Sequence, residues 1–232
     1  MASEIKQGTL ELVNHLPILQ VIVPMLIAPI LVVLNNKILS WLLSFVGSLV
    51  CLFISILLLQ TVSDGSILTY YLGGWTPPIG IEYRIDAANA ILLFLISIIS
   101  AIVLIFSYSS LHAEIPEEKH TLFYSCFLLC FTGLLGVVAT ADIFNVFVFL
   151  EISSLSTYVL VAQGSYLDKR ALSASFNYLI MGTIGATFFV IGIGYIYMAT
   201  GSLNMMDIAE RVSQLGDNRT IQAGFAFIVV GM

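Results

Sequence analysis

The stretch FNVFVFLEISSLSTYVLVA, residues 144–162, decides how the chain is interpreted. A helix of about 20 residues crosses the roughly 30 Å hydrocarbon core of a bilayer, and this apolar stretch has that length. Glu151 is its single charged residue and lies near its midpoint. Placing an acidic group there costs about 2.5 to 3.5 kcal/mol, so such residues are rare and commonly functional. The stretch therefore predicts a membrane-spanning helix with a functional carboxyl group.

The composition of the whole chain indicates a membrane protein. Of its 232 residues, 59% are hydrophobic and 9% are charged, and the mean hydropathy is +1.03. Soluble domains carry about 25% charged residues. The apolar runs are continuous, which favours helices over the alternating pattern of a membrane barrel. We expect an all-α polytopic membrane protein built as a helix bundle. The net charge of −6 argues against a nucleic-acid partner.

Six apolar stretches are long enough to span a membrane. They cover about residues 16–34, 38–60, 87–108, 121–140, 143–162 and 176–200. Pro17 suits a helix start, whereas Pro24 and Pro29 are expected to kink the first span. The run IQAGFAFIVVGM is too short to cross, so we expect the chain to end within a seventh helix, after about six and a half helices.

Three segments between the spans have recognisable patterns. In the loop of residues 61–86, YYL and IGIEYRI flank Gly-Gly and Pro-Pro, which predicts a hairpin or an ordered loop. Residues 201–217 have the apolar spacing of a short helix at the membrane interface. His112 and His120, in the loop after the third span, are interpreted as solvated residues, with a pH-sensing patch as the alternative.

Helical spacing places hydroxyl groups beside Glu151. Ser154 and Tyr158 follow it by three and seven residues, and Ser153, Ser156 and Thr157 form an adjacent stripe. Burial favours the neutral carboxyl group, and a nearby cation would favour the charged one. No Lys, Arg or His occurs inside the six expected spans. A proton carrier is the preferred hypothesis, and a neutral Glu151 that only hydrogen-bonds a neighbouring helix is the alternative.

The other polar and small residues have simpler interpretations. Asp142 and Asp86 precede spans and are expected to be N-caps, and Asp142 is alternatively a guide for protons toward Glu151. Cys51, Cys126 and Cys130 are expected to be packing residues, so no cofactor or metal site is predicted. Close helix packing is expected at small residues of two spans: Gly133, Gly136 and Thr140, and Gly182, Gly185, Ala186, Gly192 and Gly194.

Three stretches together resemble one family of proteins. They are YYLGGWTPPIGIEYRIDAANA, TGLLGVVATADIFNVFVFLEISSLSTYVLVA and FNYLIMGTIGATFFVIGIGYIYMATGSLNMMDIAERV. The family comprises the proton-conducting subunits of Mrp-type cation/proton antiporters, above all their D-type subunits, and of the membrane arms of NADH:quinone oxidoreductase and membrane-bound hydrogenases. The similarity runs from about residue 16 onward, and its most specific part is the D-I-F-N-x-F-V-F-x-E run.

The resemblance implies a fold of about fourteen helices with two inverted repeats of five. Residues 1–120 would form a three-helix region with its extramembrane loop, and residues 121–232 the start of the first repeat. Glu151 matches the key acid of the first half-channel, which works with a lysine on the seventh helix. This chain ends before any such lysine, so we expect it to be a piece of a longer product or a split subunit that a partner completes.

Three functions remain open at this point. The first is proton or monovalent cation/proton translocation in a multisubunit antiporter, with protons and possibly sodium as cargo. The second is a cofactor-free pumping subunit of NADH:quinone oxidoreductase or a hydrogenase-type complex, not catalytic by itself. The third is a non-conducting scaffold. We expect an inner membrane location in a bacterium or archaeon, with the N-terminus outside. Each side has four basic residues, Lys6, Arg84, Arg211 and Arg219 on the N-terminal side and Lys37, Lys119, Lys169 and Arg170 on the other, but three of the second set lie close to helix ends in short loops, where the positive-inside rule weighs most.

Overall fold

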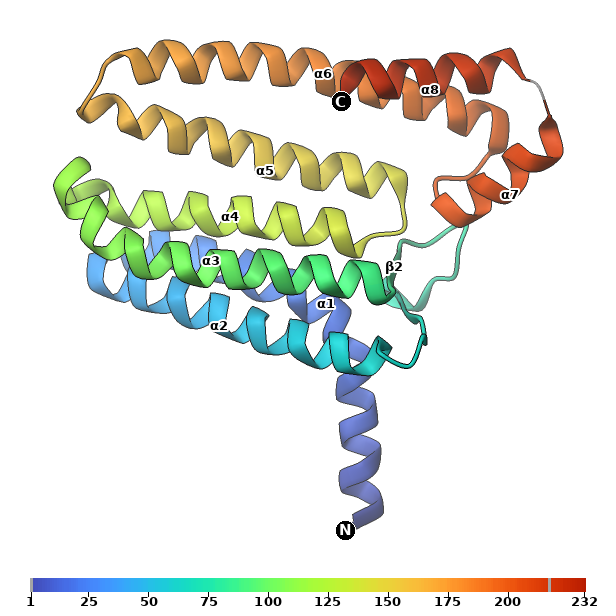
Figure 1. Ribbon diagram of the computed structural model, residues 1–232, viewed down its shortest axis with the longest axis horizontal. Helices are drawn as coiled ribbons and strands as arrows, with labels where there is room; N and C mark the ends of the chain where they lie inside the picture. Colours follow the sequence, from blue (N-terminus) through green and yellow to red (C-terminus); the bar gives the residue numbers. More distant parts are fainter. Residues whose placement is uncertain (1, 217) are drawn as a thin grey trace.

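Long helices make up most of the chain in the computed structural model, which describes residues 2–216 and 218–232 (Figure 1). The long helices are α1 (Ala2–Leu34), α2 (Lys37–Val62), α3 (Ala87–Glu114), α4 (His120–Ala139), α5 (Ile143–Gln163) and α6 (Arg170–Thr200). Two shorter helices, α7 (Met205–Leu215) and α8 (Arg219–Gly231), follow them. Within the described residues, six helices are long and apolar enough to cross a membrane, which agrees with the six expected spans.

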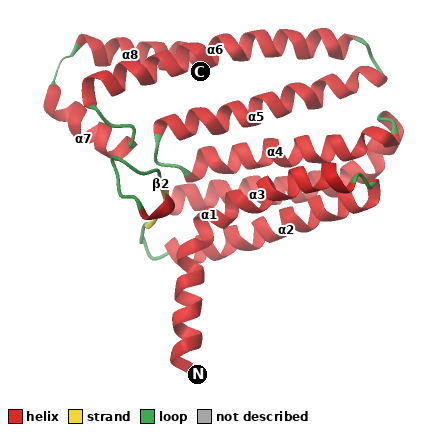
Figure 2. Cartoon of the chain, turned by 180° about the vertical axis from the view of Figure 1, so that it is seen from behind, coloured by secondary structure: helices red, strands yellow, loops and turns green. Residues whose placement is uncertain are grey.

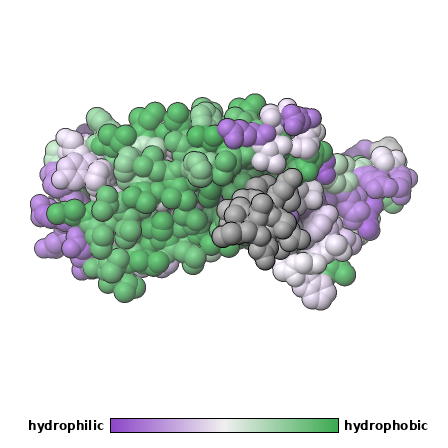
Figure 3. All heavy atoms as spheres, turned by 90° about the horizontal axis from the view of Figure 1, so that it is seen from below, coloured by the Kyte–Doolittle hydropathy of each residue, from purple (hydrophilic) through white to green (hydrophobic). Residues whose placement is uncertain are grey.

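The six spans lie side by side, and their order in the chain is largely their order in space (Figures 1 and 2). Helices α1, α2, α3 and α4 pack as a bundle, α5 packs on α4, and α6 packs on both α5 and α8. On the face shown in Figure 3, hydrophobic residues cover most of the surface along the helices, and polar residues gather toward the two ends. This is the distribution that a bilayer requires of a polytopic protein.

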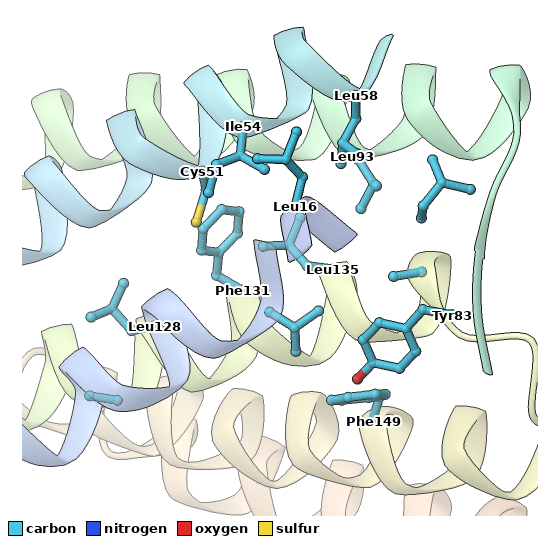
Figure 4. Packing of buried hydrophobic residues seen from close by; sticks show 14 of the residues in the cluster. Leu16, Cys51, Ile54, Leu58, Tyr83, Leu93, Leu128, Phe131, Leu135 and Phe149 are labelled. Carbon is cyan, nitrogen blue, oxygen red and sulfur yellow. The ribbon is translucent and has the colours of Figure 1, made fainter. Parts of the chain in front are cut away.

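Two clusters of buried apolar residues hold the bundle together. The larger cluster joins α1, α2, α3, α4 and the hairpin, and Phe149 brings α5 into it (Figure 4). The smaller cluster is built from Phe189, Ile193 and Ile196 of α6 with Ile208 and Ile228, and side chains of α5 pack against it. Helix α5 therefore lies at the boundary between the two clusters, with one face toward each.

The extramembrane loop contains the expected hairpin. Strand β1 (Leu68–Tyr71) pairs antiparallel with β2 (Glu82–Ile85), with Tyr70 opposite Tyr83. A short 3-10 turn, η1 (Leu72–Gly74), follows β1, and Gly73 and Gly74 adopt positive φ angles that suit glycine.

At three places the structure differs from the expected spans and connections. Pro17 lies inside α1, because that helix already begins at Ala2. Thr140 lies beyond α4, where its extended backbone caps the helix. His120 is buried as the first residue of α4, and its Nε2 donates to the carbonyl oxygen of Ile115 at 3.0 Å. Helix α3 runs on to Glu114, so the connection is short and folds over His120.

Candidate functional site

Helix α5 begins at Ile143 because Asp142 caps its N-terminus. The Asp142 carboxylate accepts the backbone N–H of Asn145 at 2.8 Å, and the side-chain amide of Asn145 donates to Thr140 Oγ1 at 3.0 Å. The expected capping role of Asp142 is therefore confirmed, as is that of Asp86, which accepts the N–H of Asn89. Burial raises the pKa of Asp142 above its ordinary value, while hydrogen bonds from the N–H groups of Asn145 and Phe144 partly offset this.

Glu151 lines a cavity of about 570 Å³ between α5, α6 and the end of α8. Phe147, Leu150 and Ser154 of α5 lie on the same wall. The α6 wall is made largely of small and apolar residues: Met181, Gly182, Ile184, Gly185, Ala186, Phe188 and Phe189. No Lys, Arg or His is among the described residues that line it. A carboxyl group in this position faces a space that can hold water beside apolar walls.

Ser154 and Tyr158 continue from Glu151 along the same face of α5. Ser154 lines the cavity, and Tyr158 lies one helical turn beyond it on the same face of α5. The Tyr158 side chain is buried against α6. The centroids of the Tyr158 and Tyr178 rings are 4.8 Å apart, and the Tyr158 hydroxyl lies over Gly182. The structure therefore brings three of the four sequence-predicted site residues together in the order Glu151, Ser154, Tyr158.

Asp142 is separate from this group. It precedes Glu151 by nine residues, which is roughly 13 Å of helix and about half a turn in direction. As the N-cap, Asp142 turns its carboxyl group back to the Asn145 N–H, and it does not line the cavity that Glu151 lines. A path between them would need intervening groups.

The second stripe of hydroxyls faces α4 and not the cavity. Cys130 of α4 lies 3.4 Å from Thr157 Oγ1 and 3.7 Å from Ser153 Oγ. Ser156 donates to the carbonyl of Ile152 within α5. None of the three lines the cavity, so the expectation that this stripe adds hydroxyls around Glu151 is wrong; the helix turns Ser153 and Thr157 toward α4. Only Ser154 and Tyr158 have the required direction.

Small residues allow the helices around the site to approach closely. A Cβ atom added to Gly133 would lie 2.7 Å from the carbonyl oxygen of Phe149 on α5, and Gly136 packs under the Phe149 ring. On α6, a Cβ atom added to Gly192 would lie 2.6 Å from the carbonyl oxygen of Gly224 on α8. The small-residue pattern thus marks real helix contacts, except at Gly194, where nothing lies within 4 Å of such an atom.

Sequence reasoning missed a short sheet beside the start of α5. Residues Thr140–Asp142 are extended and lie between β2 on one side and residues 203–205 on the other. Ala141 N–H donates to the Glu82 carbonyl at 2.9 Å, Ile143 N–H to the Leu203 carbonyl at 2.9 Å, and Met205 N–H to the Ala141 carbonyl at 2.8 Å. We call these segments the clasp: Glu82–Tyr83, Thr140–Ile143 and Leu203–Met205.

Two side chains of the clasp are buried and polar. Asn204 Nδ2 donates to Glu82 Oε2 at 2.8 Å, and both residues are at most 6% exposed. The sequence carried one usable signal, since Asn204 directly precedes an amphipathic helix and thus resembles an N-cap. Nothing in the sequence connects it to Glu82, 122 residues earlier.

The described residues include no group of three or more His, Cys, Asp or Glu side chains that could hold a metal ion. The cysteines are free thiols, of which Cys51 and Cys126 are buried. The chemistry available at the site is therefore that of one carboxyl group with hydroxyl neighbours.

Comparison with known proteins connects this geometry to one family. Residues 140–232 match the family described as NADH:quinone oxidoreductase/Mrp antiporter, TM. The chain is 38% identical over 221 residues to the N-type subunit of NADH-quinone oxidoreductase from Desulforudis audaxviator (strain MP104C), covering 94% of this chain and 43% of that protein. It is 31% identical over 222 residues to the D-type subunit of the Na(+)/H(+) antiporter from Bacillus subtilis (strain 168), covering 94% and 44%.

A solved structure has the same fold. One chain of the membrane-bound sulfane sulfur reductase, an archaeal respiratory membrane complex, superposes with a TM-score of 0.86 at 32% identity, covering 94% of this chain and 44% of that chain. This chain therefore spans less than half the length of the relatives that it matches.

Proposed function

We propose that the chain translocates protons as one subunit of a larger membrane complex. The reason is that its membrane helices place it in the NADH:quinone oxidoreductase/Mrp antiporter family. The chain supplies the acid of one half of the path, and other subunits or a longer polypeptide supply the remainder. Antiport of a monovalent cation against protons is the leading form of this activity, as the name of the Bacillus subtilis relative suggests.

Glu151 is the proton carrier in this proposal. The observation that carries it is the position of Glu151 on the wall of a cavity between three helices, within an otherwise apolar span. A carboxyl group there can be neutral when its surroundings are dry and ionised when water or a cation reaches it. Ser154 and Tyr158 extend the hydrogen-bonding groups from Glu151 along α5. We assign Asp142 the role of a cap and leave it outside the relay, because it does not line the cavity and lies roughly 13 Å from Glu151 along the helix.

Exchanging Glu151 for Gln tests this role. Glu151→Gln keeps the size and hydrogen bonding of the side chain but removes the titratable proton, so it should abolish ion-coupled proton transport. Transport is measured in vesicles that contain the full complex, by the fluorescence of a pH-sensitive dye after a cation pulse. Assembly should be unchanged, as judged by the amount of purified complex.

The matched control is Glu118→Gln, an exposed acid in the connection before α4, which should transport normally. If Glu151→Gln also transports at the normal rate, Glu151 is not the carrier. A scaffold function would then account better for the chain.

A redox-driven complex is the second candidate, and the 38% identity to an NADH-quinone oxidoreductase subunit favours it. The energy source that drives proton movement distinguishes the antiporter from the redox-driven complex. Proton movement driven by a cation gradient alone supports an antiporter, whereas movement that begins only when an electron donor is added supports a redox complex. In either case we propose an inner membrane location with the N-terminus outside.

A further inference from the structure

The clasp joins parts of the chain that are far apart in sequence and that carry both walls of the Glu151 cavity. Residues Thr140–Ile143 lead directly into α5, which holds Glu151. Residues Leu203–Met205 follow α6, which forms the opposite wall. The backbone hydrogen bonds between these two segments therefore set how far α5 and α6 slide past one another at this end (Figure 1).

Backbone pairing by itself does not determine this register. Its hydrogen bonds repeat along an extended segment, so the same pattern can form after a shift unless side chains specify one arrangement. Asn204 supplies that specification. Its Nδ2 donates to Glu82 on β2, and its Oδ1 accepts the N–H groups of Met206 and Asp207 at the start of α7 at 3.0 and 3.2 Å. One amide thus ties the start of α7 to the hairpin at a single position.

Glu82 in turn is held on its own side of the clasp. Its carbonyl accepts from Ala141, and its neighbour Tyr83 bridges to Thr140. The Tyr83 ring is buried and lies 6.5 Å from that of Phe149, which precedes Glu151 on α5 (Figure 4). Burial raises the pKa of Tyr83 to about 12, against a small opposing effect of the Asn145 side chain, so its hydroxyl stays neutral.

We propose that Asn204 and Glu82 form a positioning pair, whose hydrogen bond fixes the register of α5 against α6 and thereby the place of Glu151 in its cavity. The inference rests on the proposed function of Glu151 and adds two residues that act on it from outside the membrane span. Neither residue touches the transported proton. Their effect passes through the clasp.

Exchanging the donor and the acceptor tests the pair. Asn204→Asp keeps an oxygen that can cap α7 but removes the Nδ2 donor and places a second carboxylate against Glu82. Because misplacement of a reacting group by about 1 Å can cost a hundredfold, transport by the full complex should fall about tenfold to a hundredfold at neutral pH. Transport should recover as the pH is lowered, since two adjacent carboxyl groups then share a proton.

The double variant Glu82→Gln with Asn204→Asp restores a donor, now on the other side. It should recover transport at neutral pH and lose the acid dependence of Asn204→Asp. Asn204→Ser is the matched control for capping, because serine caps helices well but its short hydroxyl does not replace the amide donor to Glu82. It should therefore transport poorly although α7 remains capped.

A readout that does not depend on transport separates this inference from the role of Glu151. Hydrogen exchange by mass spectrometry follows the amides of Ile143 and Met205, which the clasp protects. They should exchange faster in Asn204→Asp and return to the wild-type rate in the double variant, while Glu151→Gln leaves them unchanged. Normal exchange in Asn204→Asp, or an assembled double variant that stays inactive, overturns the positioning pair whatever Glu151→Gln shows.

Discussion

Asp142 has the capping role that its place before the span predicts, and its alternative role as a guide for protons stays a prediction. It lies at the head of the span that carries Glu151, and its carboxylate satisfies an amide at the start of α5. It lies roughly 13 Å from Glu151 along the helix and does not line the cavity. Distance along the chain is therefore a poor guide to cooperation between two acids on one helix.

Asp142→Asn distinguishes a cap from a proton guide. Asparagine caps helices as well as aspartate but does not titrate, so transport by the full complex should stay close to that of the wild type. Asp142→Ala removes the cap and should lower the free energy of unfolding by about 1 kcal/mol. Loss of transport in Asp142→Asn, with assembly intact, would instead give Asp142 a place in the relay.

Asp142→Asn also tests a prediction about how the stability of the protein depends on pH. Burial raises the pKa of Asp142 from its ordinary value of 3.8, so the folded state binds this proton more tightly than the unfolded state. Stability therefore falls as the pH rises from about 3.8 through the folded-state pKa. This contribution should be absent in Asp142→Asn, as measured by the thermal unfolding of the purified protein across that range.

At the scale of helices, close contact through glycine decides how α6 meets α8. Gly192 and Gly224 bring the two backbones together, which association in a membrane requires because lipid offers no hydrophobic driving force. A side chain at Gly182 would collide with the Tyr158 hydroxyl, so this glycine allows Tyr158 of α5 to pack against α6. Of these glycines, Gly182 lies in the α6 wall of the cavity.

Two alanine substitutions on α6 should therefore have opposite consequences. Gly192→Ala places a methyl group against the Gly224 carbonyl and should cost about 1 to 3 kcal/mol of stability. Gly194→Ala meets nothing within 4 Å and should be neutral or stabilising by up to about 1 kcal/mol, since alanine favours helix. Thermal unfolding of the purified protein measures both. Equal effects at the two positions would contradict the packing of α6 on α8.

At the scale of the whole molecule, the polar residues divide between the two ends of the bundle. Lys37, Lys119, Lys169 and Arg170 lie at or just before the starts of α2, α4 and α6, at one end. The hairpin, the clasp and α7 lie at the other end (Figure 1). Arg84, Arg211 and Arg219 lie at this second end, so the number of basic residues does not separate the ends. The basic residues of the first end lie beside short connections, and because positively charged short loops face the cytoplasm, we propose an outward-facing hairpin.

Thiol labelling tests this orientation with a matched pair of sites. Ile79 on the hairpin is 82% exposed and Leu167 at the other end is 67% exposed. A membrane-impermeant maleimide added to intact cells should label Ile79→Cys and leave Leu167→Cys unlabelled until the cells are opened. The reverse pattern would invert the topology.

Local sequence was enough to establish the spans, the hairpin, the caps and the acid at the centre of α5, because each follows from hydropathy, turn residues or helical spacing. It also placed Ser154 and Tyr158 on the face of Glu151. Helix packing alone established which face of α5 meets the cavity and which meets α4, and that His120 is buried beneath a short connection. The clasp was beyond prediction for the same reason: the bond between Glu82 and Asn204 crosses 122 residues, and such a contact exists only after the helices between them have packed.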